Sequence, residues 1–494
     1  MDRKTPRMVV AVVTLASTLA TGRADATIIT PPALPRATCR ASDIPERGLQ
    51  GRLSPDDISS GYARNGITCN TDLVGRFGEK GISPGAAGGL KVLRYVDGAG
   101  HECAYYDTAA AVFLLNTPKL ATTGVGVYVL DMSDPEHPKK TANLTTPAML
   151  SPHESLNLNQ KRGLLAAVSG FGLNPGLLDV YDLTTDCRNP ILKSTTPFGI
   201  MGHEGNFSPD GNTFWTSSGG ACWTPATLSA IDISNPSAPK VVWTSGRYRF
   251  HGLSISDDGT RLYGADLGAQ VCDQLGEVDW GLKILDVSQV QARATVPVVV
   301  KEVSLLSWDT WSVPQMTIPI LKDGHPYLVE IDEYARGNAN GDPTAPVGAA
   351  RIIDIADELH PSVISDIRLE VHQPENIAAI AGDPGASSPF TGYSGHYCAV
   401  PSRHDPDILA CSFQQSGLRI FDIRDVRSPK EIAYFNSPVP AETITDDPGH
   451  TTVVPIHSPL AWSGPAFAPG RHEVWYSDVN FGFFVVRIAD ALWP

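Results

Sequence analysis

The sequence is poor in positive charge. It contains 38 lysine and arginine residues against 53 aspartate and glutamate residues, and its formal net charge is -15 at pH 7. Nucleic acids and anionic membrane surfaces are bound through clustered basic side chains, so this balance argues against both as partners. An acidic surface of this kind mainly favours solubility.

Several motifs that carry chemistry are missing as well. The chain has no phosphate-binding Walker loop, no H-E-x-x-H zinc motif and no dinucleotide fingerprint. Nucleotide and zinc-protease chemistry therefore has no support from local motifs, and a triad assembled from distant segments would leave no such motif. The sequence assigns no catalytic residue.

Long apolar runs are scarce, and the one that is present lies at the N-terminus. A basic start, the apolar run "MVVAVVTLASTLA" and the small residues Ala24 and Ala26 form the three-part pattern of a secretory signal, with cleavage expected after Ala26. No second run of about 20 apolar residues follows. We expect a signal peptide over residues 1–26 and an exported protein of the periplasm, cell surface or extracellular space that lacks a membrane span. An uncleaved N-terminal anchor is the alternative.

A repeated segment runs through the rest of the chain. Each copy is a strand-like apolar run that ends in Asp, followed by a polar turn and Pro, as in "LSAIDISNPSAP" and "LRIFDIRDVRSP". The repeated aspartates are Asp131, Asp182, Asp232, Asp286, Asp354 and Asp422. A seventh, degenerate copy, "FFVVRIADALWP", has Arg487 in the aspartate position. An Asp at this place accepts hydrogen bonds from turn N–H groups, and the Pro fixes the chain before the next strand.

The repeat predicts an all-β fold, a seven-bladed β-propeller of four-stranded blades. Hairpin signals such as "FSPDGNTFW" and "ISDDGTRLY" precede the aspartates, so each unit supplies two hairpin strands, one strand before Asp and one after Pro. The last unit runs out of chain, and we expect Asn70 to Phe77 to complete it, which closes the ring through an N-terminal strand. Residues 27–67 are then an extended tail, and residues 68–494 a single propeller domain.

The strings "LKILDVS", "LSAIDISNPSAP" and "LRIFDIRDVRSP" resemble LVIVD repeats, a motif of bacterial and archaeal exported or cell-surface β-propeller proteins. The resemblance covers residues 68 to 494 and rests on Asp and Pro recurring in register. It implies a propeller fold and export, and little about chemistry.

Four histidines occupy one position of the repeat. His203, His251 and His396 each precede an apolar strand residue by four positions, and His153 lies nearly the same way before Leu158. This position starts the innermost strand of a blade, close to the central channel. Four imidazoles directed at one axis are candidate ligands for a transition metal such as Cu, Fe or Zn.

A four-histidine propeller centre resembles that of carotenoid-cleavage oxygenases. A histidine-bearing propeller of this length also resembles selenium-binding methanethiol oxidases. Both analogies concern fold and residue type only. The alternative is a structural role, in which each imidazole bonds a neighbouring strand or blade.

Glutamates follow two of these histidines. Because successive strand residues face opposite sides of a sheet, Glu154 and Glu204 are expected to point away from the side that His153 and His203 face. They are candidate supporting residues that accept a hydrogen bond from an imidazole of an adjacent blade. An alternative of equal weight is that each carboxylate accepts hydrogen bonds from nearby turn amides.

Loops on the same side of the propeller contain further candidates. Trp223, Trp280, Trp308 and Trp311 would form an aromatic ligand face there, or would cover blade ends. The chain has eight cysteines and no Cys-x-x-Cys, and an oxidising compartment favours their pairing. Candidate disulfides join Cys222 to Cys272 across adjacent blades and Cys398 to Cys411 across a hairpin.

Two functional hypotheses follow. The first is a secreted or cell-surface scaffold that binds a protein, polymer or small ligand through its loop-rich face and needs no cofactor. The second is a metal-dependent oxidoreductase that uses His153, His203, His251 and His396 in the channel. The sequence leaves both open.

Overall fold

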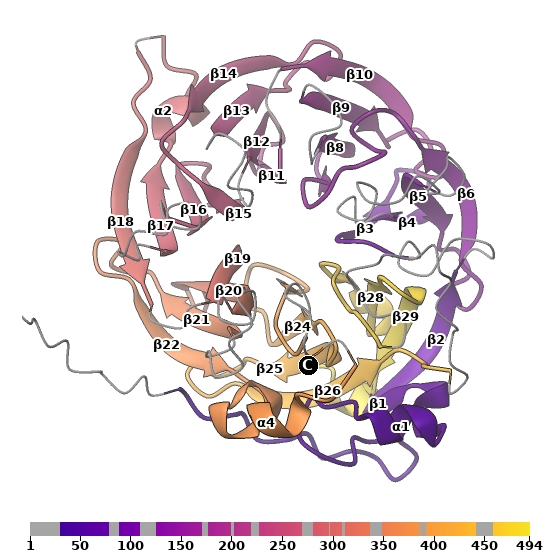
Figure 1. Cartoon of the computed structure of the whole chain (residues 1–494). Helices are drawn as coiled ribbons and strands as arrows, with labels where there is room; N and C mark the ends of the chain where they lie inside the picture. Colours follow the sequence, from indigo (N-terminus) through magenta and orange to yellow (C-terminus); the bar gives the residue numbers. More distant parts are fainter. Residues whose placement is uncertain are drawn as a thin grey trace, which may run out of the picture.

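The computed structural model is that of a propeller whose blades surround a central channel (Figure 1). The first strand of each blade lies nearest the channel and the fourth lies at the rim. The structure describes residues 30–78, 88–108, 125–169, 176–198, 202–218, 227–268, 280–295, 297–308, 312–335, 348–384, 386, 392–440 and 458–494.

Blades 1 to 4 follow one another along the chain as antiparallel four-stranded sheets. Blade 1 contains β3 (Val92–Val96), β4 (Glu102–Asp107), β5 (Val127–Asp131) and β6 (Lys139–Leu144). Blade 2 contains β7 (Asn157–Asn159), β8 (Leu164–Val168), β9 (Leu177–Asp182) and β10 (Ile191–Pro197). Blade 3 contains β11 (Glu204–Phe207), β12 (Thr213–Ser217), β13 (Leu228–Asp232) and β14 (Lys240–Ser245). Blade 4 contains β15 (Phe250–Ile255), β16 (Arg261–Asp266), β17 (Gly281–Asp286) and β18 (Lys301–Ser307).

Blades 5 to 7 complete the ring. Blade 5 contains β19 (Ser312–Lys322), β20 (His325–Ala335), β21 (Ala350–Asp354) and β22 (Ser362–Ile367). Blade 6 contains β23 (Tyr397–Ala399), β24 (Ile408–Phe413), β25 (Gly417–Asp422) and β26 (Lys430–Asn436), with β1 (Ile67–Cys69) as a fifth strand at its rim. Blade 7 contains β27 (Ala466–Ala468), β28 (Glu473–Asp478), β29 (Gly482–Ile488) and β2 (Thr71–Phe77). Seven blades confirm the prediction from the repeat.

The N-terminal strand closes the ring as predicted. β2 pairs antiparallel with β29, with Thr71 opposite Ile488 and Phe77 opposite Phe483. The residues just before it, β1, pair with β26 of the preceding blade. One continuous segment therefore joins the rims of blades 6 and 7, and no long edge of blade 7 is left open.

The repeated aspartates have the predicted turn chemistry. Each ends the third strand of its blade, and its carboxylate accepts the backbone N–H of the residue two positions on, at distances of 2.9–3.0 Å. Arg487, in the degenerate copy, lies within β29 and pairs with Glu473 at 3.4 Å. The change is therefore local, and blade 7 keeps its strand order.

The hydrophobic core lies between adjacent blades. Ile420 of blade 6 and Val474 and Tyr476 of blade 7 belong to one cluster of fully buried side chains. Each such side chain contributes about 1.5–3 kcal/mol through removal of its apolar surface from water. The channel-facing ends of the strands are positioned by this packing.

Residues 30–66, which were expected to be extended, contain a short helix α1 (Pro55–Ser59) and a 3-10 turn η1 (Tyr62–Asn65). We call residues 30–69 the strap, because they run along the rim of blades 5 and 6 (Figure 1). Glu46 of the strap forms a buried ion pair with Arg419 of blade 6, and Arg52 pairs with Asp383 at 2.8 Å. The segment is thus bonded to the propeller through charged side chains.

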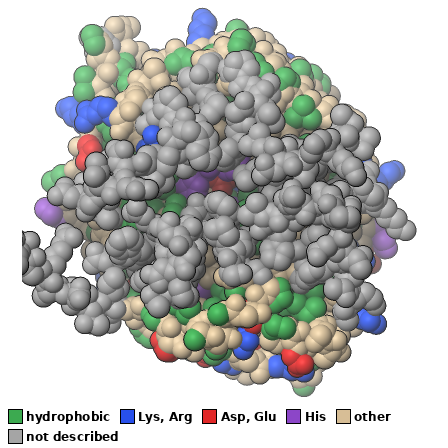
Figure 2. Space-filling model, viewed as in Figure 1, with side chains coloured by type: hydrophobic (Ala, Val, Ile, Leu, Met, Phe, Trp, Pro, Cys, Tyr) green, Lys and Arg blue, Asp and Glu red, His purple; other side chains and the backbone are tan. Residues whose placement is uncertain are grey.

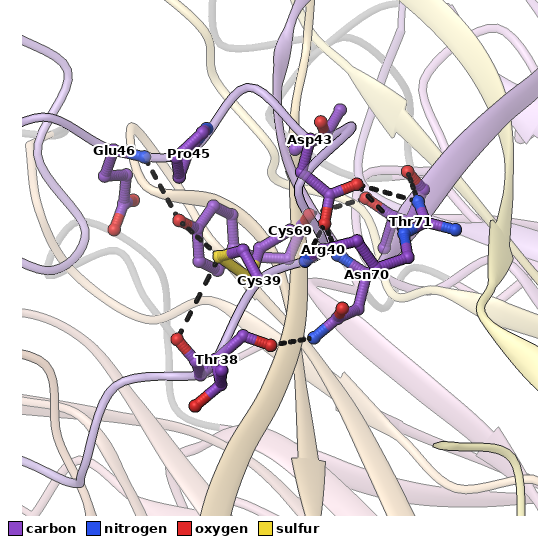
Figure 3. Close-up of a disulfide and its surroundings, with 12 residues drawn as sticks. Thr38, Cys39, Arg40, Asp43, Pro45, Glu46, Cys69, Asn70 and Thr71 are labelled. Atoms are coloured by element: carbon purple, nitrogen blue, oxygen red, sulfur yellow. Dashed lines mark hydrogen bonds and ion pairs between the residues drawn. A yellow bond between two sulfur atoms is a disulfide. The ribbon is translucent and has the colours of Figure 1, made fainter. Parts of the chain in front are cut away.

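Three disulfides are formed among the described residues. Cys39–Cys69 joins the early part of the strap to β1 at its end (Figure 3), Cys103–Cys187 joins blades 1 and 2, and Cys398–Cys411 crosses the β23–β24 hairpin in the expected pairing. Cys222 and Cys272 lie outside the described residues.

The remaining helical elements are single turns, and none of the described helices is both long and apolar enough to cross a membrane. They are α2 (Ser288–Gln291), η3 (Glu370–His372), η4 (Pro374–Asn376), α4 (Ile377–Ile380), η5 (Pro469–Arg471) and η6 (Asp490–Leu492).

Candidate metal centre

One position recurs at the start of the innermost strand of all seven blades, four residues before an apolar residue. Its side chains are all buried, with at most 8% of their surface exposed. In blade order they are Lys91, Glu154, His203, His251, Gln315, His396 and Ser463. These seven residues line the channel. They include three histidines, which carry imidazoles, and Glu154, which carries a carboxylate.

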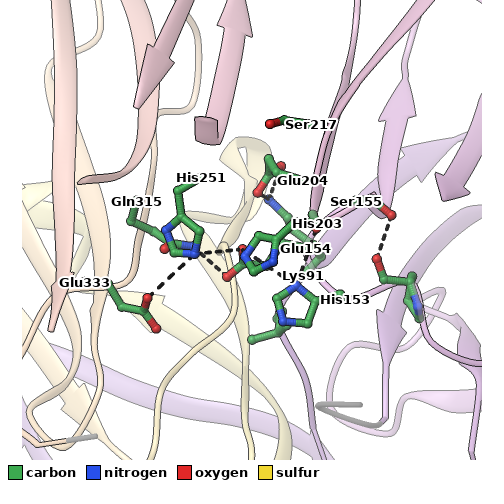
Figure 4. Close-up of polar contacts among 12 residues, drawn as sticks. Lys91, His153, Glu154, Ser155, His203, Glu204, Ser217, His251, Gln315 and Glu333 are labelled. Carbon is green, nitrogen blue, oxygen red and sulfur yellow. Dashed lines mark hydrogen bonds and ion pairs between the residues drawn. The ribbon is translucent and has the colours of Figure 1, made fainter. Parts of the chain in front are cut away.

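Glu154 lies at the middle of the histidine cluster (Figure 4). Its Oε2 atom is 2.8 Å from Nε2 of His203, 3.7 Å from Nε2 of His251 and 3.8 Å from Nδ1 of His153. Its Oε1 atom is 3.3 Å from Nε2 of His396. The structure thus brings the four histidines together around one carboxylate, and the expectation that Glu154 faces away from them is wrong.

The local backbone explains this difference. The strand β7 begins only at Asn157, and before it the chain forms an isolated bridge between Glu154 and Glu204. His153 has φ of 50°, in the left-handed region, so the regular alternation of sides does not apply to it. Glu154 therefore occupies the channel position of blade 2, and His153 reaches the same centre from one residue earlier.

The imidazole rings are oriented by backbone carbonyls. Nδ1 of His251 is 3.2 Å from the carbonyl oxygen of Pro314, and Nδ1 of His396 bonds the carbonyl oxygen of Trp462. A carbonyl only accepts, so each Nδ1 carries the hydrogen and donates it. With Nδ1 bonded in this way, Nε2 is the ring atom left to face Glu154, and it offers the lone pair that a metal ligand needs whenever the ring is neutral.

The distances suit a metal ion. Ligand bonds of about 2.0–2.2 Å allow two ligand atoms on one ion to be no more than about 4.4 Å apart. His153, Glu154 and His203 offer ligand atoms that all lie within 4.8 Å of one another, so small side-chain adjustments bring them into range. Two imidazoles with one carboxylate form the donor set of many non-haem iron sites.

Blade 5 contributes two further polar groups. Glu333 of β20 lies 3.8 Å from Nε2 of His251 and 3.5 Å from Nε2 of His396. Gln315 of β19 donates from its amide nitrogen to Oε1 of Glu154 at 2.6 Å. Sequence analysis missed both residues. Gln315 holds the histidine position of its blade in "WSVPQMTIP", which was a usable signal, whereas Glu333 has no repeated counterpart.

Electrostatics prepare the centre for a cation. Burial acts to raise the pKa of Glu154, but the adjacent His203, His251 and His153 outweigh it and hold that pKa well below its usual range. Burial lowers the pKa of His153 well below its usual value and also lowers that of His251. Ionised carboxylate and neutral imidazole are the forms that bind metals.

His396 differs from the other rings. Burial acts to lower its pKa, but hydrogen bonds to Glu154 and Glu333 outweigh burial and raise that pKa to about 9. In the absence of a metal, His396 is therefore an imidazolium held between two carboxylates.

Glu204 belongs to a neighbouring polar cluster. Its carboxylate is 3.0 Å from Nζ of Lys91 and accepts a hydrogen bond from the Tyr397 hydroxyl at 2.6 Å. The Lys91 ammonium also lies 3.9 Å from the centre of the Tyr397 ring. Burial raises the pKa of Glu204 to about 7, with Lys91 opposing the rise. Glu204 thus borders the histidine cluster without facing it.

The structure describes two of the four tryptophans that were expected in the aromatic face. Trp280 is 1% exposed, and Trp308 packs its ring against the guanidinium of Arg351 at 4.0 Å. Trp223 and Trp311 lie outside the described residues. Trp280 therefore offers no open surface, Trp308 is half-buried, and the aromatic face as a whole stays a prediction.

The channel can be seen from one face of the propeller. Histidine and acidic side chains are visible at its centre in the space-filling view (Figure 2). They mark the position of the cluster shown in Figure 4.

No protein-family model matches the chain, and no curated protein sequence matches it. Solved structures similar to it include the periplasmic gluconolactonase PpgL of Pseudomonas aeruginosa, 14% identical over 74% of this chain and 88% of that one, with a TM-score of 0.49. Hydrazine synthase of Kuenenia stuttgartiensis is 13% identical over 84% and 99% of the two chains, with a TM-score of 0.46. Sqt1 of Chaetomium thermophilum is 12% identical over 85% and 99%, with a TM-score of 0.45. Likenesses this distant carry no argument about activity, substrate or partner, and what is established for this chain is the seven-bladed β-propeller fold.

Proposed function

We propose that this protein is a metal-dependent oxidoreductase whose metal lies in the propeller channel. The observation that carries the proposal is the contact of four buried histidines, from blades 2, 3, 4 and 6, with the single carboxylate of Glu154. Burying an ionised carboxylate among imidazoles that are mostly neutral is costly, and a bound cation would offset that cost.

Iron is the metal that the donor set favours, with copper and zinc as the alternatives. His153, His203 and Glu154 form a two-histidine, one-carboxylate set, which is typical of non-haem iron(II) oxygenases. Bound iron would supply redox and Lewis-acid chemistry that these side chains do not have by themselves.

The surrounding residues would hold the ligands and exclude water. The carbonyl oxygens of Pro314 and Trp462 fix the rings of His251 and His396. None of the four histidine side chains is more than 9% exposed. A rigid, dry shell of this kind is what a metal centre requires for selective chemistry.

The scaffold hypothesis ranks second. It places binding on the loop-rich face, and one of the tryptophans expected there, Trp280, is buried. The channel cluster, by contrast, requires a chemical explanation that a binding surface does not give.

We also propose that the chain is exported, with residues 1–26 as a signal peptide and the LVIVD-type propeller over residues 68–494. The three disulfides support an oxidising compartment. N-terminal sequencing of the secreted protein tests this: a mature start at Thr27 is expected, and a start at Met1 would contradict it.

Metal analysis of protein purified without chelators tests the metal centre. At least one transition-metal ion per chain is expected in the wild type, and the double variant His203→Ala with His251→Ala should lose it. His325→Ala is the matched control, because that imidazole is 42% exposed on the β19–β20 hairpin. Absence of a stoichiometric metal, or an unchanged content in the double variant, would overturn the proposal.

A further inference from the structure

We infer that the channel holds two metal ions bridged by the carboxylate of Glu154. This inference rests on the proposed metal centre and extends it from one ion to two. It follows from how the four histidines are placed around the two oxygens of Glu154 and the two of Glu333.

The two oxygens of Glu154 face different partners. Oε2 lies 2.8 Å from His203, 3.7 Å from His251 and 3.8 Å from His153, whereas Oε1 lies 3.3 Å from His396. A carboxylate in this arrangement can bind one ion through each oxygen. Sites with two metals generally hold their ions about 3.5–4 Å apart, a distance that one bridging carboxylate spans.

Glu333 marks the second position. Its Oε1 is 3.5 Å from Nε2 of His396 and its Oε2 is 3.8 Å from Nε2 of His251. The two rings already direct their Nε2 atoms to this side, because their Nδ1 atoms are bonded to backbone carbonyls. Glu333 thus contacts both His251 and His396, and in our proposal these three side chains and Glu154 would hold the second ion after side-chain adjustment.

Gln315 adds an independent observation. Its side chain is fully buried, and its Oε1 atom has no hydrogen-bond partner among the described residues. A buried amide oxygen without a partner destabilises the folded state, because it has lost its hydrogen bonds to water. The amide nitrogen of the same group is bonded to Oε1 of Glu154, so the free oxygen lies beside the bridging carboxylate (Figure 4). A cation near this oxygen would remove this destabilisation.

The competing arrangement contains one ion and a protonated His396. In it, the imidazolium supplies the positive charge between Glu154 and Glu333 that the second ion supplies in our proposal. The two arrangements differ in the number of ions bound, which can be counted.

Anaerobic titration of metal-free protein with Fe(II) counts the ions. We expect two equivalents bound by the wild type, and one by Glu333→Gln and by His396→Ala. Glu358→Gln is the matched control, since Glu358 lies on the surface in an ion pair with Arg261 and should leave two equivalents. Thermal melts establish that each variant is folded, and Glu333→Gln keeps the shape of the side chain if His396→Ala is unstable.

The outcomes separate the two proposals. One equivalent in the wild type, unchanged in Glu333→Gln, would overturn the two-ion inference and leave a single metal centre in place. A wild type that binds neither Fe(II), Cu(II) nor Zn(II) in the same titration would overturn both. A fall from two equivalents to one in Glu333→Gln, with two kept in Glu358→Gln, supports the bridged site.

Discussion

The buried carboxylate of Asp107 should make the propeller less stable as pH rises from 4 to 8. Asp107 ends β4 in blade 1, and its Oδ1 accepts the backbone N–H groups of Leu90 and Lys91 at 2.9 and 3.0 Å. Its Oδ2 has no hydrogen-bond partner among the described residues, and a Cβ added to Gly89 would lie 2.0 Å from it. Burial raises the pKa of Asp107 to about 7, although the two N–H groups oppose the rise.

The sign and size follow from proton linkage. Between the ordinary pKa of 3.8 and the folded value of about 7, the folded state binds more protons than the unfolded state. The free energy of unfolding therefore falls as pH rises through that window. A difference of about three pH units at about 1.4 kcal/mol each gives about 4 kcal/mol as the upper limit.

Asp107→Asn should remove this dependence, because the amide is neutral and its oxygen can still accept from Leu90 and Lys91. Urea unfolding, followed by tryptophan fluorescence at intervals from pH 4 to pH 8, gives the free energy of both proteins. The variant should gain stability relative to the wild type by about 4 kcal/mol across this range. Asp425→Asn, the same change at an exposed turn, is the control. A difference between Asp107→Asn and the wild type that stays constant with pH would refute the reasoning.

Three further predictions concern the rim and the channel. Replacing Cys39 and Cys69 together by Ser should lower the free energy of unfolding by about 3.6 kcal/mol, because the unfolded chain regains the entropy of a closed loop of 30 residues. An unchanged urea midpoint would contradict this prediction. Arg419→Met should destabilise the fold by about 3–5 kcal/mol in thermal or urea unfolding. It removes the guanidinium that lies 2.9 Å from the carboxylate of the fully buried Glu431. A loss of less than about 1 kcal/mol would argue against a stabilising ion pair. Gly252→Ala should reduce the metal content of the protein. The added Cβ would lie 2.2 Å from a backbone oxygen of blade 5, so the change should displace β15, the strand that carries the proposed ligand His251. Full metal content in the variant would show that the strand tolerates the change.

The fold could be predicted because its signals are local. Each aspartate from Asp131 to Asp422 bonds its own turn, so the spacing of these residues counts blades before any long-range contact is known. The closing strand could be placed because blade 7 lacked a fourth strand, and Thr71 to Phe77 fills that gap.

The site was predictable only in part, for reasons of backbone geometry. The histidines share a register, which repetition reveals. Glu154 was placed on the wrong side because the left-handed φ of His153 interrupts the strand, in which successive side chains face opposite sides of the sheet. That dihedral angle cannot be read from a single sequence. Glu333 reaches the channel from the second strand of a single blade, so nothing repeats to indicate it.

Pairing of the cysteines was harder still. Cys398 and Cys411 are neighbours across a hairpin, which the sequence shows directly. Cys39 meets Cys69 only because the strap folds back along the rim, and that path depends on ion pairs with blades 5 and 6.

Closure by β2 also sets an order of events during protein synthesis. The strand that seals the ring is made among the first residues of the propeller, and its partner β29 is made among the last. Until Gly482 to Ile488 leave the ribosome, blades can form one after another, but the circle stays open and the channel has no fixed diameter. The ligands from blades 2 to 6 therefore reach their final spacing only after the chain is complete. A stop codon placed just before Gly482 would leave every proposed ligand in the polypeptide and still prevent the centre from being assembled.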